Sequence, residues 1–495
     1  MNFHIKKVAI VGGSSAGLLS AVTLKYFFPK LHILLLYSKK HAPIGVGEST
    51  TAWFPQFLHE HLNISREEFY KSIWPVWKLG IRFEWGVPHI SHFNYTFDGQ
   101  FRYESQLLSK IPGFYCMHDM RQASRYSILM DKHHAPLLHD GKGNIKILSD
   151  GFGYHIDVYE FINYLTAKAL SLGVDIQDLE VLDAKLDEYG NVQHLCCADD
   201  LKVNADLFID CSGFKSQLLG KALQEKFISF GYRLFCDSAI VGNWKRRSPI
   251  FPFTTATTMN SGWRWRIDLR DRVSFGYVYS SSFCSQDEAI QEYLSLTPYA
   301  TEDLRKISFR SGRYKRFWVN NVIAIGNASG FVEPLESTGQ HMIVETIWRV
   351  VLALQDSNLC PTPKLIDATN RYVVDLWDEI CDFLTLHFKF NRRLDTPFWK
   401  YCQEETDLGS LQNLVELYQD SGVCHAIAHL IPKSSIFEID GYLTLLCGQQ
   451  VLVKNLQPMA DAEITEWLKY RQILHNNLEN SVSPQEAFYF LESLY

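Results

Sequence analysis

The first forty residues constrain the fold more than any other part of the chain. Residues 6–28, KKVAIVGGSSAGLLSAVTLKYFF, read as an apolar strand, a glycine turn and a helix with apolar residues at helical spacing. Residues 31–37, LHILLLY, read as a second buried strand. This order predicts a βαβ unit and therefore a parallel sheet. The helix would begin at the turn, where its backbone N–H groups can hold a pyrophosphate.

The glycine turn matches the dinucleotide-binding pattern G-x-G-x-x-G only in part. Residues 12–17 are GGSSAG, so Ser14 replaces the middle glycine, which normally lets the backbone approach the phosphates. The second strand ends at Tyr37, where an acidic residue would often bind the ribose. Alone, the pattern indicates nucleotide binding weakly, because packing of the helix on the strand uses the same glycines.

The rest of the chain continues the α/β pattern. Residues 205–216 read as a buried strand and a turn, and residues 320–350 as a strand, a glycine loop and a helix that starts near Thr338. We therefore predict an α/β fold in which a discontinuous dinucleotide-binding domain covers residues 1–350. It carries an inserted sheet at about residues 226–310, and a mostly helical region follows over residues 351–495.

Composition excludes several classes of function. The formal net charge of -7 and the absence of a long basic block argue against a nucleic-acid partner. No apolar run reaches the length of a membrane span, and the early first strand leads us to expect no secretory signal. The eleven cysteines show no metal-ligand or redox spacing, so we expect no metal site and reduced thiols in a cytoplasmic protein.

A pair of tryptophans stands in residues 261–269, SGWRWRIDL. Strict alternation predicts a strand with Trp263 and Trp265 on one face. The ordinary interpretation of such a pair is a half-buried strand with an aromatic face.

Several motifs, in order over residues 8–400, resemble the flavin-dependent halogenases, the family that includes the tryptophan halogenases. They are GVGEST (45–50), WKLGIRFEWG (77–86), GYHIDVYEFINYL (153–165), ADLFIDCSGF (205–214), GWRWRID (262–268), GYVYSS (276–281), FVEPLESTG (331–339) and LTLHFKFNRRLDTPFW (384–399). The family pattern F-x-x-P-x-x-S-x-G is met in full, whereas W-x-W-x-I-P has Asp268 in place of proline.

The resemblance implies a fold and a reaction. The fold would be the Rossmann-like FAD-binding domain of the GR2 type, which aromatic hydroxylases share. FAD would arrive reduced (FADH2) from a separate NAD(P)H flavin reductase. With O2 it would oxidise chloride, bromide or iodide to hypohalous acid, which would halogenate a small electron-rich aromatic molecule.

The resemblance also implies two catalytic residues. Lys78 would hold hypohalous acid or carry the halogen as a haloamine, although a lysine in a strand is ordinarily a solvated charge. Glu336 would stabilise positive charge on the aromatic ring and accept the displaced proton. The alternative for Glu336 is an acid that complements a helix dipole.

Further residues follow from the same resemblance. Ser337, Thr338 and Gly339 would bind halide at a helix start, or Ser337 or Thr338 would be an ordinary N-cap. Trp263 and Trp265 would separate the flavin from the organic substrate. The expected cofactor-binding residues are Gly12, Gly13, Ser15, Ala16, Gly17, Ser38, Ile44, Val46, Gly47, Val181, Asn327 and Gln340.

Two other functions compete with halogenation. An aromatic hydroxylase of the same fold usually has Asp-Gly where this chain has Ser212-Gly213, and Gly-Asp where it has Gly326-Asn327. A non-enzymatic flavin-binding module would not need Lys78. The substrate is not specified, because Tyr442 stands where tryptophan halogenases tend to have a tryptophan. Halide preference and oligomeric state are also not specified.

Overall fold

A computed structural model describes residues 4–40, 47–99, 122–140, 142, 144–148, 151–296, 304–455 and 460–494. The chain forms two compact units, each assembled from three separate segments. The first unit comprises Met1–Trp74, Ile156–Gly231 and Phe309–Asp378, and the second comprises Pro75–His155, Tyr232–Ser308 and Glu379–Tyr495. The sequence-based domain boundary at residue 350 stays a prediction.

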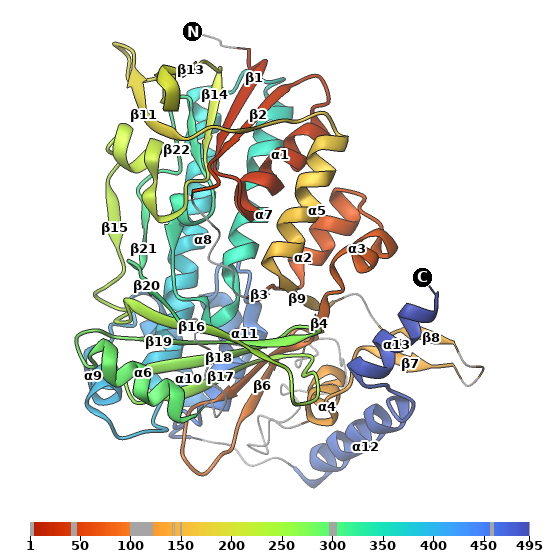
Figure 1. Ribbon diagram of the computed structural model, residues 1–495. Helices are drawn as coiled ribbons and strands as arrows, with labels where there is room; N and C mark the ends of the chain where they lie inside the picture. The colour runs from red at the N-terminus through yellow and green to blue at the C-terminus, as the bar shows by residue number, and fades with distance from the viewer. Residues whose placement is uncertain are drawn as a thin grey trace. The chain divides into compact units, whose positions relative to one another are not determined.

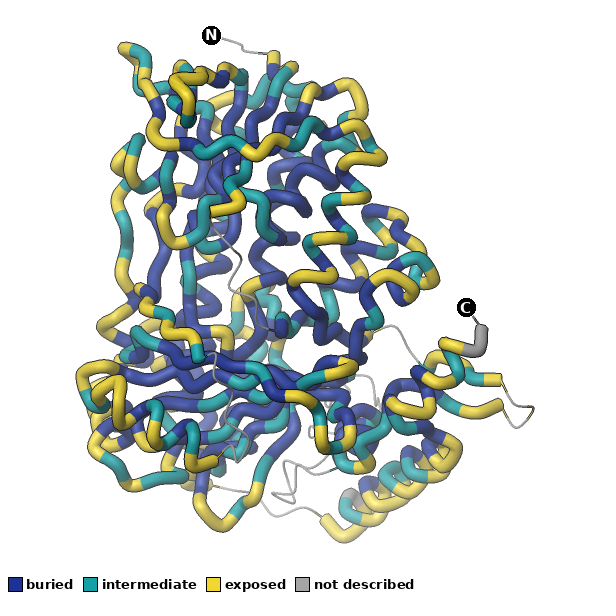
Figure 2. The backbone as a smooth tube through the Cα atoms, in the orientation of Figure 1, coloured by how far each residue is buried: buried dark blue, intermediate teal, exposed yellow. Residues whose placement is uncertain are grey.

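The first unit is built on a six-stranded sheet in the order β10-β2-β1-β14-β23-β22. All neighbours are parallel except β22 and β23, which form an antiparallel pair. The predicted βαβ unit is confirmed as β1 (Lys7–Val11), α1 (Ser15–Phe27) and β2 (His32–Tyr37). Helices α5 (Val158–Ser171) and α7 (Thr338–Asp356) pack beside α1 (Figure 1). Strands β1, β2 and β14 are mostly buried along their length, as expected for a sheet covered by helices (Figure 2).

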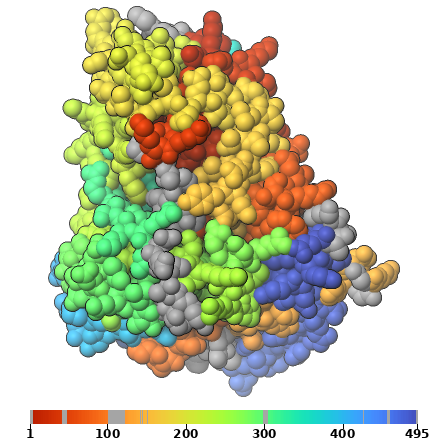
Figure 3. All heavy atoms as spheres, viewed as in Figure 1, coloured from red at the N-terminus to blue at the C-terminus, as the bar shows by residue number. Residues whose placement is uncertain are grey.

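Shorter elements complete the first unit. They are β3 (Gly47–Ser49), α2 (Trp53–Gln56), α3 (Arg66–Ile73), β10 (Asp175–Asp178), β11 (Val181–Leu186), β12 (Val192–Cys197), β13 (Lys202–Val203), β14 (Leu207–Asp210), β15 (Phe227–Ser229), β21 (Gly312–Tyr314), β22 (Trp318–Val319), β23 (Val322–Ala324) and β24 (Gly330–Phe331). The yellow segment that holds β11 and β12 lies at the surface (Figure 3), and Leu182 and Leu186 of β11 are exposed there. Val181 and Ala184 on the other face of β11 belong to the core.

The second unit is built on a seven-stranded sheet in the order β20-β16-β19-β18-β17-β5-β6. Its neighbours are antiparallel, except that β17 and β5 run parallel. The strands are β5 (Gly80–Glu84), β6 (Phe93–Thr96), β16 (Ser238–Lys245), β17 (Thr254–Met259), β18 (Gly262–Asp268), β19 (Arg272–Tyr279) and β20 (Arg305–Ser308). Five of them come from the region predicted to be a sheet, whereas β5 and β6 join it from far earlier in the chain.

Helices dominate the C-terminal part, as predicted. They are α8 (Pro363–Phe390), α9 (Pro397–Glu405), α10 (Gln412–Ser421), α11 (Glu438–Gly448), α12 (Asp461–Asn477) and α13 (Pro484–Leu494). Earlier in the chain lie β4 (Val76–Lys78), α4 (Arg125–Lys132), β7 (Leu137–His139), β8 (Ile145–Ile147), β9 (Gly153–Asp157) and α6 (Gln286–Ser295). Among the helices that the structure describes, none is long and apolar enough to cross a membrane.

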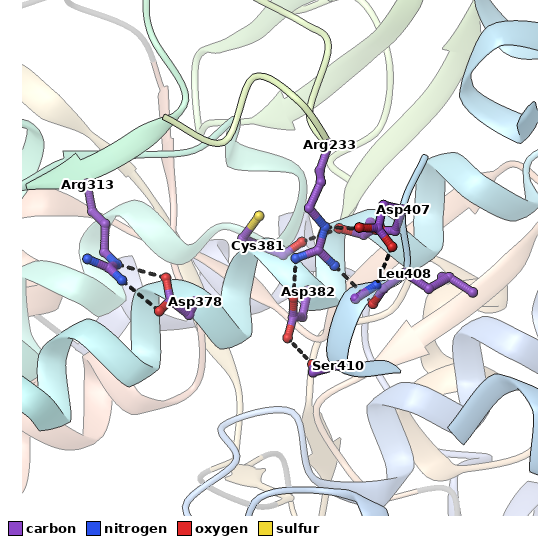
Figure 4. Close-up of polar contacts among 10 residues, drawn as sticks. Arg233, Arg313, Asp378, Cys381, Asp382, Asp407, Leu408 and Ser410 are labelled. Carbon is purple, nitrogen blue, oxygen red and sulfur yellow. Dashed lines mark hydrogen bonds and ion pairs between the residues drawn. The ribbon is translucent and has the colours of Figure 1, made fainter. Parts of the chain in front are cut away.

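Two carboxylates of α8 hold arginines from elsewhere in their own units (Figure 4). In the first unit, Asp378 accepts from Nε and Nη2 of Arg313, both at 2.7 Å. In the second unit, Asp382 pairs with Arg233, whose Nε also donates to the Asp407 carbonyl at 2.8 Å. Because the Arg313 pair is bidentate, it fixes the orientation of β21 as well as its distance from α8.

Candidate active site

The turn between β1 and α1 is shaped by three glycines. Gly12 has φ +121°, and a Cβ there would lie 2.2 Å from the Cys211 carbonyl oxygen. A Cβ on Gly17 would lie 1.8 Å from the Gly12 carbonyl oxygen, and one on Gly13 would lie 2.5 Å from Cβ of Tyr37. The glycines therefore permit close packing of α1 on the sheet.

Ser14, which replaces the middle glycine, adopts φ -89° and ψ -173°. Any residue can adopt this extended conformation, so the replacement strains nothing. The Ser14 side chain makes no capping hydrogen bond to α1, and the turn at residues 12–14 is half-exposed. Ser15 and Ala16 form the buried first turn of the helix. An uncapped helix start beside an open turn suits a pyrophosphate.

The other expected cofactor residues of the first unit lie in different environments. Ser38 is half-buried after β2, and its Oγ accepts from the Lys40 N–H at 3.3 Å. Val181 packs in the core, and its carbonyl accepts from Gln217 at 3.1 Å. Asn327 belongs to a short 3-10 helix, η6 (Gly326–Ala328), and is half-buried. Two expected residues, Ile44 and Val46, lie outside the described residues.

Helix α7 begins at Thr338, where the sequence predicts it. Ser337 has φ 59° and stands at the N-cap position, yet its side chain makes no capping bond. Its Oγ donates instead to Ser49 Oγ at 3.0 Å, which connects the start of α7 to the end of β3. Gly339 is exposed, and a Cβ built on it would meet no atom within 4 Å. The first turn of α7 thus has no side-chain cap, and it has open space beside Gly339. A small anion could bind the backbone N–H groups there.

Buried polar side chains adjoin this helix start. Gln340 hydrogen bonds to Glu48, and burial raises the pKa of the Glu48 carboxyl. His341 Nδ1 and Thr51 Oγ1 lie 2.9 Å apart in a hydrogen bond, and burial lowers the pKa of His341 to about 4. Among the described residues, Gln340 Oε1 and His341 Nε2 are buried with no hydrogen-bond partner. Glu48 lies in the motif GVGEST, but nothing local in that motif indicates these contacts.

Glu336 lies in a short 3-10 helix, η7 (Pro334–Glu336), directly before α7 and in the first unit. Its residue is 2% exposed. An acid that served only to complement the dipole of α7 could do so from the surface, so its burial favours a site role.

Lys78 lies in the second unit at the end of β4, which pairs with β9 in antiparallel register opposite Gly153. Its residue is 0% exposed, contrary to the ordinary expectation for a strand lysine. The Nζ atom lies 4.9 Å from the centroid of the Phe97 ring. A buried ammonium beside an aromatic face is typical of a functional amine, because desolvating it is costly.

His155 on β9 is a buried residue near Lys78 that the sequence analysis did not single out. It is 0% exposed and hydrogen bonds to the Thr254 hydroxyl and the Asp268 carbonyl, at 2.8 and 3.1 Å. Burial and the charge of Lys78 lower the pKa of His155 to about 3. The only local signal is a histidine between Tyr154 and Ile156.

Trp263 and Trp265 lie on β18 as predicted, with ring centroids 5.9 Å apart. They are 1% and 7% exposed, so the pair is more buried than a half-buried strand requires. Trp265 stands opposite Gly276 of β19, and a Cβ on that glycine would lie 2.0 Å from the indole ring. Among the described residues, the Trp265 Nε1–H has no hydrogen-bond partner.

Asp268, the residue in place of the family's proline, is fully buried at the end of β18. Its carboxylate accepts from Arg246 at 2.7 Å and from Arg266 at 2.9 and 3.1 Å. Two arginines compensate the buried charge, so this strand end is held by ion pairs.

Comparisons with known proteins agree with these features. Residues 7–464 match the family model described as tryptophan halogenase. The chain belongs to the tryptophan halogenase family. Tryptophan 7-halogenase RebH of Lentzea aerocolonigenes is 31% identical over 449 residues, covering 85% of this chain and 83% of RebH.

Two solved halogenase structures are similar over nearly the whole chain. MibH, a lanthipeptide tryptophan 5-halogenase, matches with a TM-score of 0.90 at 34% identity. The match covers 98% of this chain and 93% of MibH. Xcc4156, a flavin-dependent halogenase from Xanthomonas campestris, has a TM-score of 0.88 at 27% identity, with 99% of each chain covered. The protein is therefore a flavin-dependent halogenase, an oxidoreductase, and its fold class is as predicted.

The roles of individual residues in this halogenase stay predictions. Lys78 and Glu336 belong to different units, so their pairing also stays a prediction. Tyr442 is 1% exposed and packs against Phe383 of α8, with its hydroxyl 3.4 Å from Glu379. Among the described residues, no group of three or more His, Cys, Asp or Glu side chains is placed to hold a metal ion.

Proposed function

We propose that this halogenase uses FADH2, O2 and a halide to halogenate a small electron-rich aromatic molecule. The complete burial of the Lys78 ammonium is the observation that carries the proposal. Lysine is among the residues least often fully buried, and a desolvated amine is a group that can act on electrophilic halogen.

The flavin fits the first unit of this halogenase. The uncapped start of α1 would hold the pyrophosphate, since the turn at residues 12–14 is half-exposed and its glycines pack tightly. Ser38, Val181, Asn327 and Gln340 would line the cofactor as the family resemblance implies. Bound FADH2 supplies the two electrons that let O2 oxidise halide to hypohalous acid. The halide would bind the first turn of α7, beside Gly339.

Lys78 would hold hypohalous acid by an N–H hydrogen bond or carry its halogen. The aromatic carbon then forms a bond to halogen and the halogen–oxygen bond breaks, and the oxygen takes a proton from the Lys78 ammonium and leaves as water. Glu336 would accept the ring proton. Trp263 and Trp265, both buried, would keep the organic substrate away from the flavin and so favour halide oxidation over hydroxylation.

A separate NAD(P)H flavin reductase is part of the proposal, because one dinucleotide-binding turn serves one dinucleotide. A cytoplasmic location fits this supply of NAD(P)H and fits the described cysteines, none of which forms a disulfide.

The reaction class is tested with purified protein, FAD, NADH, a flavin reductase, O2 and bromide. We expect brominated product from a panel of indoles and phenols, detected by exact mass, and no product without the reductase. Oxygenated product in place of aryl bromide would establish the hydroxylase alternative. Oxidation of FADH2 that is independent of halide and substrate would establish a flavin-binding module.

The role of Lys78 is tested by Lys78→Met. We expect aryl bromide formation to fall at least ~100-fold, as for loss of a catalytic proton-transfer group, while FADH2 oxidation continues. Lys185→Met, which changes an exposed strand lysine, is the matched control. Aryl bromide formation in Lys78→Met above that given by free hypobromite would remove Lys78 from the mechanism.

A further inference from the structure

His155 and Lys78 share one face of the β4–β9 strand pair. His155 lies directly opposite Val76, and Lys78 lies two residues beyond Val76 along the same strand. Side chains at alternate positions of a strand, and directly opposite across a pair, point to the same side. The imidazole and the ammonium are therefore diagonal neighbours, and the Lys78 charge contributes to lowering the pKa of His155.

Two hydrogen bonds fix the proton on His155. The Asp268 carbonyl oxygen can only accept, so Nδ1, at 3.1 Å, carries the hydrogen. In the neutral ring Nε2 then holds a lone pair, which accepts from the Thr254 hydroxyl at 2.8 Å. Burial and the nearby ammonium both disfavour a second proton, so the ring is neutral at pH 7.

A neutral imidazole near Lys78 would compete with the lysine for electrophilic halogen. Its Nε2 lone pair is a nucleophile, and the amine of Lys78 becomes one when its ammonium gives up a proton. Either can attack the halogen of hypohalous acid: the nitrogen–halogen bond forms, the halogen–oxygen bond breaks, and the oxygen leaves as water with the proton that the nitrogen group gives up. Halogen captured by the imidazole would be lost to the substrate.

We propose that the Thr254 hydroxyl caps the Nε2 lone pair of His155 and so directs electrophilic halogen to Lys78. This inference rests on the proposed function. Thr254 is 4% exposed and lies on β17, and Asp268 at the end of β18 supplies the second partner of the ring. The arginine pairs of Asp268 hold that strand end in place, so this chain secures the cap with charged groups where the family pattern has a proline.

The test compares Thr254→Val with wild type. Valine keeps the shape of threonine but removes the hydroxyl. Each protein receives the same small excess of reagent hypobromous acid at pH 7, without flavin, and is digested for peptide mass spectrometry. We expect about tenfold more bromine on His155 in Thr254→Val, the effect of losing one hydrogen bond, and less bromine on Lys78.

Two further variants separate the cap from a packing defect. Thr257 lies on β17 like Thr254, and its hydroxyl donates to Glu84 of β5. Thr257→Val loses that bond and should leave His155 unmodified, as in wild type. Thr254→Ser keeps the hydroxyl and should restore protection. Equal bromination of His155 in wild type and Thr254→Val would overturn the inference. So would an unmodified His155 in Thr254→Val, whether or not Lys78 is brominated.

The same variants assayed with flavin, reductase and bromide distinguish two failures. If wild type forms no aryl bromide, the proposed function fails, whatever the peptide masses show. If wild type forms aryl bromide but the reagent experiment shows no difference at His155, only the cap fails.

Discussion

At the scale of single residues, the absence of a side chain at Gly276 leaves room for the Trp265 ring. A Cβ there would overlap the Trp265 ring at 2.0 Å, and the indole has little space to move because it is buried. We expect Gly276→Ala to lower the free energy of unfolding by about 1–3 kcal/mol, the usual cost of overpacking. Urea denaturation followed by fluorescence measures this. Gly151→Ala, where the added Cβ would meet only Tyr126 Oη at 4.0 Å, is the control. Equal midpoints for the two variants would show that Trp265 moves freely.

At the scale of elements, the start of α7 can be tested without disturbing its fold. Gly339 is exposed and faces open space, so Gly339→Ala should leave thermal stability unchanged or raise it by up to about 1 kcal/mol, because alanine favours helices. If halide binds in that space, the methyl group should raise the apparent KM for bromide about tenfold, equivalent to about 1.4 kcal/mol of lost binding. Flavin affinity, measured by fluorescence quenching, serves as the control. An unchanged KM for bromide would place the halide elsewhere.

At the scale of the whole molecule, each unit contains a buried neutral histidine that makes the fold sensitive to acid. The pKa of His155 is about 3 and that of His341 about 4, both below the ordinary value of 6.5. As pH falls from 6.5, the unfolded chain takes up protons that these folded histidines do not bind, so stability decreases. Each should contribute a loss of about 2 kcal/mol by pH 5.

Urea denaturation at pH 7 and pH 5 tests this dependence. His155→Asn keeps a donor for the Asp268 carbonyl without a titratable ring, and His341→Gln removes the other ring. Each variant should lose about 2 kcal/mol less than wild type between the two pH values. His32→Asn, at an exposed position, is the comparison for loss of a histidine as such. If all four proteins lose the same amount, these histidines are protonated in the folded state.

The sequence by itself determined the elements whose signals are local. Apolar periodicity and the glycine turn specified β1, α1 and β2, and the change from loop to helical spacing placed the start of α7 at Thr338. The motif order specified the family. The resemblance that these motifs carry pointed to Lys78, Trp263 and Trp265, and strict alternation placed the two tryptophans on one face of a strand.

Only the tertiary structure decided burial and partnership, because both depend on segments distant in sequence. Lys78 reads as a solvated charge until β4 pairs with β9, some seventy-five residues later, and its residue becomes fully buried. Strand β5 pairs in parallel with β17, which no local pattern indicates. His155 acquires its fixed tautomer from Thr254 and Asp268, about a hundred residues away. The sequence determines which chemical groups are present. Whether a group is buried, hydrogen-bonded or neutral depends on which strands the fold brings together.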